Sequence, residues 1–193
     1  MRKLLLLIFF VATAPAALSQ EAPKSAGQQP QDNPLSAHNR FGYGMIKTVL
    51  LRSAEKMPEE GYGFRPTEAV RSYGQIVGHL ADAQYTFCSA ALGEKNPALA
   101  LRIEKNKTSK ADLIAALKDS FAYCDRAYDQ MTDAAGTQTV KFMGMETPRL
   151  FVLTGNQIHD AEHYGNLVTY MRMKNIVPPT SEPGFVPPPQ PKK

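Results

Sequence analysis

Three histidines in this sequence have the spacing of a metal site. His159 and His163 are four residues apart in the segment NQIHDAEHYGNLVTYM. In an α-helix, residues i and i+4 lie one turn apart on the same face, so both imidazoles can bind one ion. His79 lies far upstream in a second helical pattern, QIVGHLADAQYTF, and the fourth histidine of the chain, His38, is elsewhere. The sequence therefore predicts a metal site formed by His79, His159 and His163.

Neutral imidazole nitrogen suits zinc, nickel and iron, and three such ligands leave a coordination position open. The alternative is that these histidines only form hydrogen bonds. A ligating histidine usually donates its second N–H to a carboxylate or carbonyl. By helical phase, Asp82 is the predicted partner of this kind, whereas Asp160 and Glu162 fit solvated carboxylates better. Gln75 and Asn156 lie about one turn before a histidine and are candidates to line the site.

Apolar periodicity predicts four helices that position these side chains. They are expected at about 35–57, 72–92, 109–132 and 147–174, with a short hairpin or extended loop at 136–146. Four helices of this length with little strand predict an all-α fold, a four-helix bundle. Such bundles build metal sites from side chains on facing helices, here the second and the fourth.

Capping residues support the starts of three of these helices. Ser72 and Gln75 have the spacing of a capping box, and Ser109 is an N-cap residue for the third helix. Thr147 followed by Pro148 predicts that the fourth helix begins there, since proline is tolerated in a first turn.

The predicted core-facing side chains follow the helical period. In the first helix they are Phe41, Met45, Ile46, Val49 and Leu50. In the other three helices they are Ile76, Leu80, Ala83 and Phe87; Leu113, Leu117, Phe121 and Tyr128; and Ile158, Gly165 and Leu167.

The chain is expected to contain one folded domain, preceded by a signal peptide and a linker and followed by a disordered tail. Residues 1–20 resemble a cleavable signal peptide, with a basic start, a short apolar core and small residues at the end. A linker (21–34), the bundle (35–177) and a proline-rich disordered tail (178–193) follow. The expected location is therefore periplasmic or secreted, with no membrane span after cleavage; an uncleaved N-terminal anchor is the alternative.

The charge of the chain bears on its partners, and its two cysteines bear on whether it contains a disulfide. Without residues 1–20, 20 basic and 18 acidic residues remain, a net charge of +2 with no basic stripe, so no nucleic-acid partner is expected. Cys88 and Cys124 fall on two different predicted helices. In an oxidising compartment they can pair, but two buried free thiols are equally compatible with the sequence.

The histidine motifs also resemble those of the DinB-like family of bacterial four-helix bundles. In that family a histidine lies midway along the second helix, here within SYGQIVGHLADAQ, and a pair lies in the last helix, here HDAEHYGNLVTYMRMKNIVPP. The resemblance covers about residues 35–179. It implies a divalent metal, zinc or nickel, on His79, His159 and His163. It also makes a homodimer an expectation, because family members often pair through helix faces.

The resemblance does not imply one reaction, since relatives include thiol-dependent transferases and proteins with no assigned activity. Two classes of function follow. The first is an exported metal-binding protein without turnover. The second is a metal-dependent enzyme acting on an unknown small-molecule substrate, either a hydrolase using metal-bound water or a thiol-dependent transferase.

Overall fold

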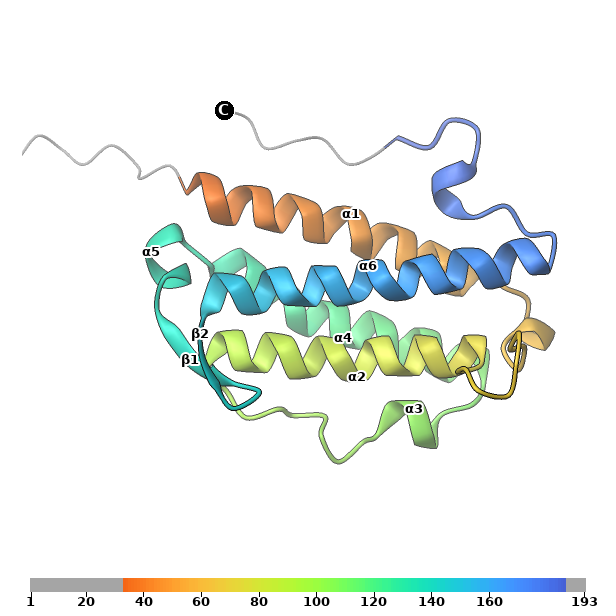
Figure 1. The fold of residues 1–193 in the computed structure, drawn as a ribbon, viewed down its shortest axis with the longest axis horizontal. Helices are drawn as coiled ribbons and strands as arrows, with labels where there is room; N and C mark the ends of the chain where they lie inside the picture. The colour runs from red at the N-terminus through yellow and green to blue at the C-terminus, as the bar shows by residue number, and fades with distance from the viewer. Residues whose placement is uncertain (1–32, 187–193) are drawn as a thin grey trace, which may run out of the picture. The chain divides into compact units, whose positions relative to one another are not determined.

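The computed structural model describes residues 33–186, and in them four long helices form the bundle that the sequence predicts. They are α1 (Pro34–Lys56), α2 (Tyr73–Leu92), α4 (Lys110–Gln130) and α6 (Arg149–Met173). Helices α1 and α2 each pack against both α4 and α6, so the four surround one core (Figure 1). Among the described residues, no helix is both long enough and apolar enough to cross a membrane.

Five shorter elements lie between the long helices, and a sixth, η2, follows α6. They are η1 (Glu59–Gly61), α3 (Ile103–Asn106), α5 (Asp133–Gly136), β1 (Thr139–Phe142), β2 (Met145–Pro148) and η2 (Pro179–Ser181). Helix α3 lies beside α2, in the connection that runs back along that helix before α4 begins (Figure 1). It becomes important for the candidate site, although its four residues are too few to give a periodic signal.

The hairpin ahead of α6 corrects the predicted start of that helix. Strands β1 and β2 pair antiparallel, with Thr139 opposite Pro148 and Val140 opposite Thr147. Thr147 and Pro148 are therefore paired in a strand, and α6 begins at Arg149. Thr147 and Pro148 are held in the β1–β2 strand pairing, so their backbone cannot also form the first turn of the helix.

The predicted caps of α2 and α4 are confirmed. The Ser72 side chain accepts the backbone N–H of Gln75, and the Gln75 side chain accepts the backbone N–H of Ser72. Ser109 likewise accepts the backbone N–H of Asp112. These bonds satisfy amide donors that have no partner within a helix and fix where each helix begins.

The predicted core of α2 and α4 is confirmed, because the four apolar side chains expected on each helix are buried. The prediction for α1 is only partly right. Val49 and Leu50 are buried, but Tyr43 takes the place expected for Phe41 and Met45, which are only partly buried. The Tyr43 ring stacks on Tyr128 with ring centroids 3.8 Å apart, which turns α1 toward this aromatic pair.

Helix α6 has a more polar inner face than its sequence suggested. Leu167 is buried as expected, but Ile158 is 64% exposed. The buried positions near the middle of the helix are instead Asn156, Asp160 and His163. Polar side chains that are buried in a bundle core require partners, and these partners make up the candidate site.

A disulfide joins Cys88 on α2 to Cys124 on α4, with their Cα atoms 5.3 Å apart. Of the two alternatives left open by the sequence, the structure therefore has the cross-link. Both half-cystines are fully buried, and they lie between the helices rather than at the surface.

The predicted signal peptide (1–20), most of the linker (21–34) and the end of the proline-rich tail lie outside the described residues. The first part of that tail, residues 178–186, includes η2 and contacts the bundle. Pro179 is buried, and Glu182 forms ion pairs with Arg52 and Lys56 of α1.

Candidate metal centre

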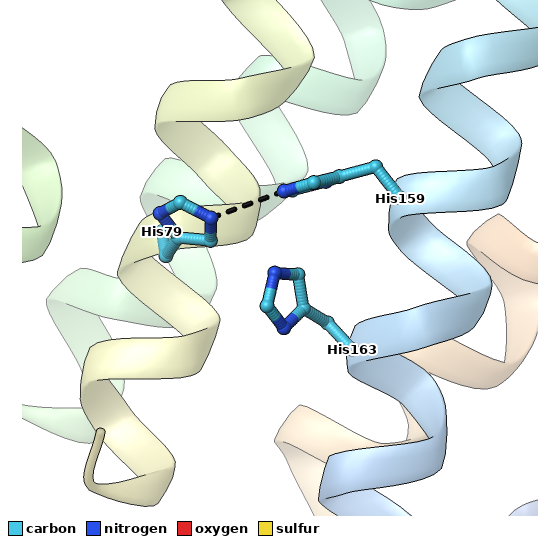
Figure 2. A group of neighbouring side chains, drawn as sticks. All are labelled: His79, His159 and His163. Atoms are coloured by element: carbon cyan, nitrogen blue, oxygen red, sulfur yellow. Dashed lines mark hydrogen bonds between the residues drawn. The ribbon is translucent and has the colours of Figure 1, made fainter. Parts of the chain in front are cut away.

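The structure brings the three predicted histidines together. His79 comes from α2, and His159 and His163 come from successive turns of α6, which lies beside α2 (Figure 2). One nitrogen from each ring lies within 4.8 Å of the others. The Nε2 atoms of His79 and His159 are 3.0 Å apart. A tetrahedral zinc ion with bonds of about 2.1 Å holds its nitrogen ligands about 3.4 Å apart, so the group is close to the size that the ion requires.

The carboxylate that contacts this group is Glu104, which the sequence analysis missed. Its Oε2 lies 3.0 Å from His79 Nδ1, and its Oε1 accepts the Nε–H of Arg71 at 2.8 Å. A carboxylate only accepts, so the proton of neutral His79 lies on Nδ1 and the lone pair of its Nε2 faces the other two rings.

Asp82, the predicted partner, acts one step further out. Its carboxylate accepts the backbone N–H groups of Ile103 and Glu104 at 2.9 and 3.0 Å, which anchors α3 against α2. Gly78 permits the close approach, because a Cβ at that position would lie 2.8 Å from the Glu104 Cα. Asp82 therefore positions the carboxylate that contacts His79 and is not itself that carboxylate.

Burial keeps two of the imidazoles neutral. It lowers the pKa of His159 to about 4, helped by the neighbouring His163 and His79 rings, and it also lowers the pKa of His163. Burial alone would raise the pKa of Glu104, but the hydrogen bond and charge of Arg71 outweigh it, so that pKa is lowered. At neutral pH the site thus offers unprotonated nitrogens beside a negative carboxylate, and a cation need not displace protons from His159 or His163.

The remaining ring nitrogens of His163 and His159 differ in their hydrogen-bond partners. His163 Nδ1 lies 3.3 Å from the Asn166 side-chain amide. As placed, the amide nitrogen Nδ2 donates to Nδ1; with the amide turned over, its oxygen accepts from Nδ1–H and Nε2 is left to bind the ion. His159 Nδ1 is buried and has no hydrogen-bond partner among residues 33–186. This ring is therefore held by packing, including Phe87 at 5.7 Å between centroids.

Four other polar residues that the sequence places near the histidines lie in two different environments. Asp160 is fully buried and accepts two hydrogen bonds from the Gln84 amide, so it is not a solvated carboxylate. Asn156 donates to Gln84 Oε1 in the same buried network and does not reach the histidines. Gln75 and Glu162 both line a cavity beside His163.

Replacing Asp160 by asparagine is expected to remove a pH dependence from the stability of the metal-free protein. Burial, partly offset by Gln84, raises the Asp160 pKa from 3.8 to about 7. Between these values the folded chain binds more protons than the unfolded chain, so Asp160 lowers the free energy of unfolding as pH rises, by at most about 1.4 kcal/mol per pH unit. Above pH 7 the penalty is complete. Urea unfolding of the wild type and of Asp160→Asn from pH 4 to pH 9 measures this loss of stability.

The difference in unfolding free energy between wild type and Asp160→Asn isolates this group, because His159 titrates in both proteins. This difference in unfolding free energy should change with pH below 7 and be constant above pH 7. Parallel stability curves over the whole range would contradict the rise in the Asp160 pKa that burial causes.

Replacing Glu104 by glutamine is expected to weaken zinc binding about tenfold, the lower end of the effect of losing a ligand's carboxylate partner. Glutamine retains an acceptor for His79 but loses the charge that pairs with Arg71 and favours a cation. Competition with a coloured zinc chelator measures the affinity. Glu94→Gln is the matched control, since Glu94 pairs with Arg126 and Tyr123 instead. Equal losses in both variants would contradict the role assigned to Glu104.

Comparisons with known proteins agree on the fold. A DinB-like protein from Bacillus cereus superposes with a TM-score of 0.61 at 15% identity, covering 77% of this chain and 95% of its own. One from Bacillus subtilis gives 0.60 at 18% identity, covering 78% and 99%. A mycothiol-dependent maleylpyruvate isomerase gives 0.53 at 17% identity, covering 70% and 60%.

At the level of sequence, no curated protein matches this chain. The profile of the DinB superfamily matches residues 47–167, a segment that contains α2, α4 and all three histidines of the candidate centre. The match extends over more than half of the chain and agrees with the four-helix arrangement and with the position of the histidine group, and on these grounds the chain belongs to the DinB superfamily.

Proposed function

We propose that this chain is an exported metal-binding protein that holds one divalent ion on His79, His159 and His163. The observation that carries the proposal is the convergence of three ring nitrogens, all within 4.8 Å, from two facing helices. Two of these rings are kept neutral by burial, and the third has its lone pair directed inward by Glu104. Zinc and nickel suit an all-imidazole ligand set of this kind.

Export is supported by two independent features. Residues 1–20 have the pattern of a secretory signal. The Cys88–Cys124 disulfide fits an oxidising compartment such as a bacterial periplasm, because cytosolic reductants keep most thiols reduced.

A metal-dependent enzyme is the second candidate, and the cavity beside His163 favours it. The cavity has a volume of about 580 Å³, within the range of small-molecule sites. A bound ion would supply a Lewis-acid centre there, and Glu162 at the cavity wall offers a carboxylate for proton transfer. The mycothiol-dependent neighbour is the ground for a thiol-dependent transferase. The proposed export would separate this chain from cytosolic thiols, so we favour a hydrolase.

Self-association also belongs to the proposal. Phe151 and Ile158 lie seven residues apart on α6 and are 65% and 64% exposed, so they form an apolar strip on the outer side of the helix. A second copy packed on this strip would give a homodimer. Sedimentation of the mature chain measures whether it is a dimer, and Ile158→Glu, which places a charge on the strip, is expected to be a monomer.

Metal content tests the function directly. The mature chain is purified without a histidine tag from its export compartment, and bound metals are measured by mass spectrometry. We expect one equivalent of zinc or nickel in the wild type and none in His159→Ala or His163→Ala. His38→Ala is the matched control, since His38 is exposed and its Nδ1 lies 2.8 Å from the Pro34 carbonyl at the start of α1. No metal in the wild type, even after reconstitution, would overturn the proposal.

A further inference from the structure

The cavity beside His163 is built from four parts of the chain. The loop before α2, the first turns of α2, α3 and the C-terminal half of α6 contribute to its wall. Of these parts, the loop carries the two side chains that bear on its chemistry, Arg65 and Arg71. Guanidinium groups bind carboxylates and phosphates through paired N–H donors.

The loop that carries the arginines is tied to the bundle at both ends. The Tyr170 hydroxyl of α6 donates to the Arg71 backbone carbonyl at 2.9 Å. Near the other end, the backbone N–H of Tyr73 donates to the Phe64 carbonyl at 2.9 Å, and the Phe64 ring packs edge-on against Tyr170. The two guanidiniums are therefore presented from a fixed backbone, which lowers the entropic cost of binding a ligand.

The two arginines are compensated to different degrees. Arg71 pairs with Glu104 at 2.8 Å, and Glu104 in turn contacts His79, so this charge is coupled to the metal ligands. Among the described residues, the carboxylate that pairs with Arg65 is that of Glu68. Its Oε2 lies 3.7 Å from the Arg65 guanidinium, and the Glu68 side chain is 96% exposed. An exposed pair of that length contributes little, so Arg65 keeps most of its positive charge toward the cavity.

The surrounding charges also favour an anion. A second cavity of about 500 Å³ shares Arg65 and Glu104 with the first and adds Lys105 and Lys107. Together the two cavities are lined by four cationic side chains and two carboxylates, Glu104 and Glu162. A divalent ion on the histidines would add two more positive charges at the His163 side.

We propose that the cavity binds a small molecule carrying a carboxylate or phosphate group, with Arg65 as the main anion-binding side chain and Arg71 as the second. This inference rests on the proposed metal centre, since the remainder of the ligand would lie at His163. It names the class of molecule on which the candidate enzyme would act: a small oxyanion, rather than a neutral or cationic compound.

Calorimetric titration of the zinc-loaded, mature chain tests the inference. The probes are succinate and inorganic phosphate, with neutral succinamide as the uncharged match for succinate. We expect at least one anion to bind, succinamide not to bind, and Arg65→Gln to weaken the anion about 10- to 100-fold. The tighter of the two anions identifies the preferred group. Arg40→Gln is the matched control, because Arg40 lies on α1 and pairs with Asp129.

Zinc content is measured on every sample before titration, so the two proposals can fail separately. A wild type without zinc overturns the metal centre, and titration of that metal-free chain still decides the arginine site. A zinc-loaded chain that binds neither anion overturns the anion site alone. Equal anion affinities in Arg65→Gln and Arg40→Gln overturn it as well.

Discussion

Zinc is expected to raise the melting temperature of the wild-type chain by about 10 °C when free zinc exceeds its dissociation constant about a thousand-fold. The ion binds the folded chain, in which three ring nitrogens converge, and has no comparable site in the unfolded chain. His79→Ala, His159→Ala and His163→Ala are each expected to abolish most of this shift. Scanning calorimetry of each protein with zinc and with a chelator measures it.

The reason for so large a loss is that each ring contributes a different constraint. His79 is the only ligand on α2, and Glu104 fixes its orientation. His159 and His163 are one turn apart on α6, so one cannot substitute for the other's position. His38→Ala should retain the full shift. An undiminished shift in any of the three site variants would mean that zinc stabilises the chain from somewhere else.

The predictable part of the centre was local in sequence. The four-residue spacing of His159 and His163 places them on one helix face, and helical periodicity alone gives that result. Pairing α2 with α6 needed only the general rule that bundle sites use facing helices, together with the family resemblance. The caps at Ser72 and Ser109 could likewise be predicted from the sequence, because an N-cap hydrogen bond joins residues three apart.

The unpredictable part depended on contacts between distant residues. Glu104 follows His79 by 25 residues and lies on a helix of four residues, so neither spacing nor periodicity relates the two. The one signal in the sequence was Gly78, whose missing side chain permits the approach of α3. Helical phase correctly placed Asp82 near the site, but it could not show that backbone N–H groups of α3 would occupy its carboxylate.

The errors in α1 and α6 have one physical origin, which is that polar and aromatic side chains compete with aliphatic ones for the core. Tyr43 is buried because its hydroxyl reaches the Phe121 carbonyl and its ring stacks on Tyr128. Asp160 is buried because Gln84 satisfies it, which leaves Ile158 on the outer face. A hydrophobicity pattern treats such polar residues as exposed and so assigns the wrong phase.

Loss of the Cys88–Cys124 disulfide is expected to destabilise the chain by about 4 kcal/mol, the loop-closure estimate for a link across about 36 residues. The bond connects α2 to α4, and without it the unfolded chain gains conformational freedom. Chemical unfolding of Cys88→Ala/Cys124→Ala against oxidised wild type measures the difference. Alanine is preferred to serine because both sites are fully buried, and a hydroxyl there would need a partner.

Reduced wild type separates the cross-link from the change of side chains. It should match the double variant within about 1 kcal/mol, and the double variant should not respond to reductant. The double variant should still bind one zinc ion, because Cys88 faces α4 while His79 on the same helix faces α6. A difference below about 1 kcal/mol between oxidised and reduced wild type would mean that the unfolded chain is already restricted without the bond. A loss of zinc together with the disulfide would instead show that the α2–α4 link sets the position of His79.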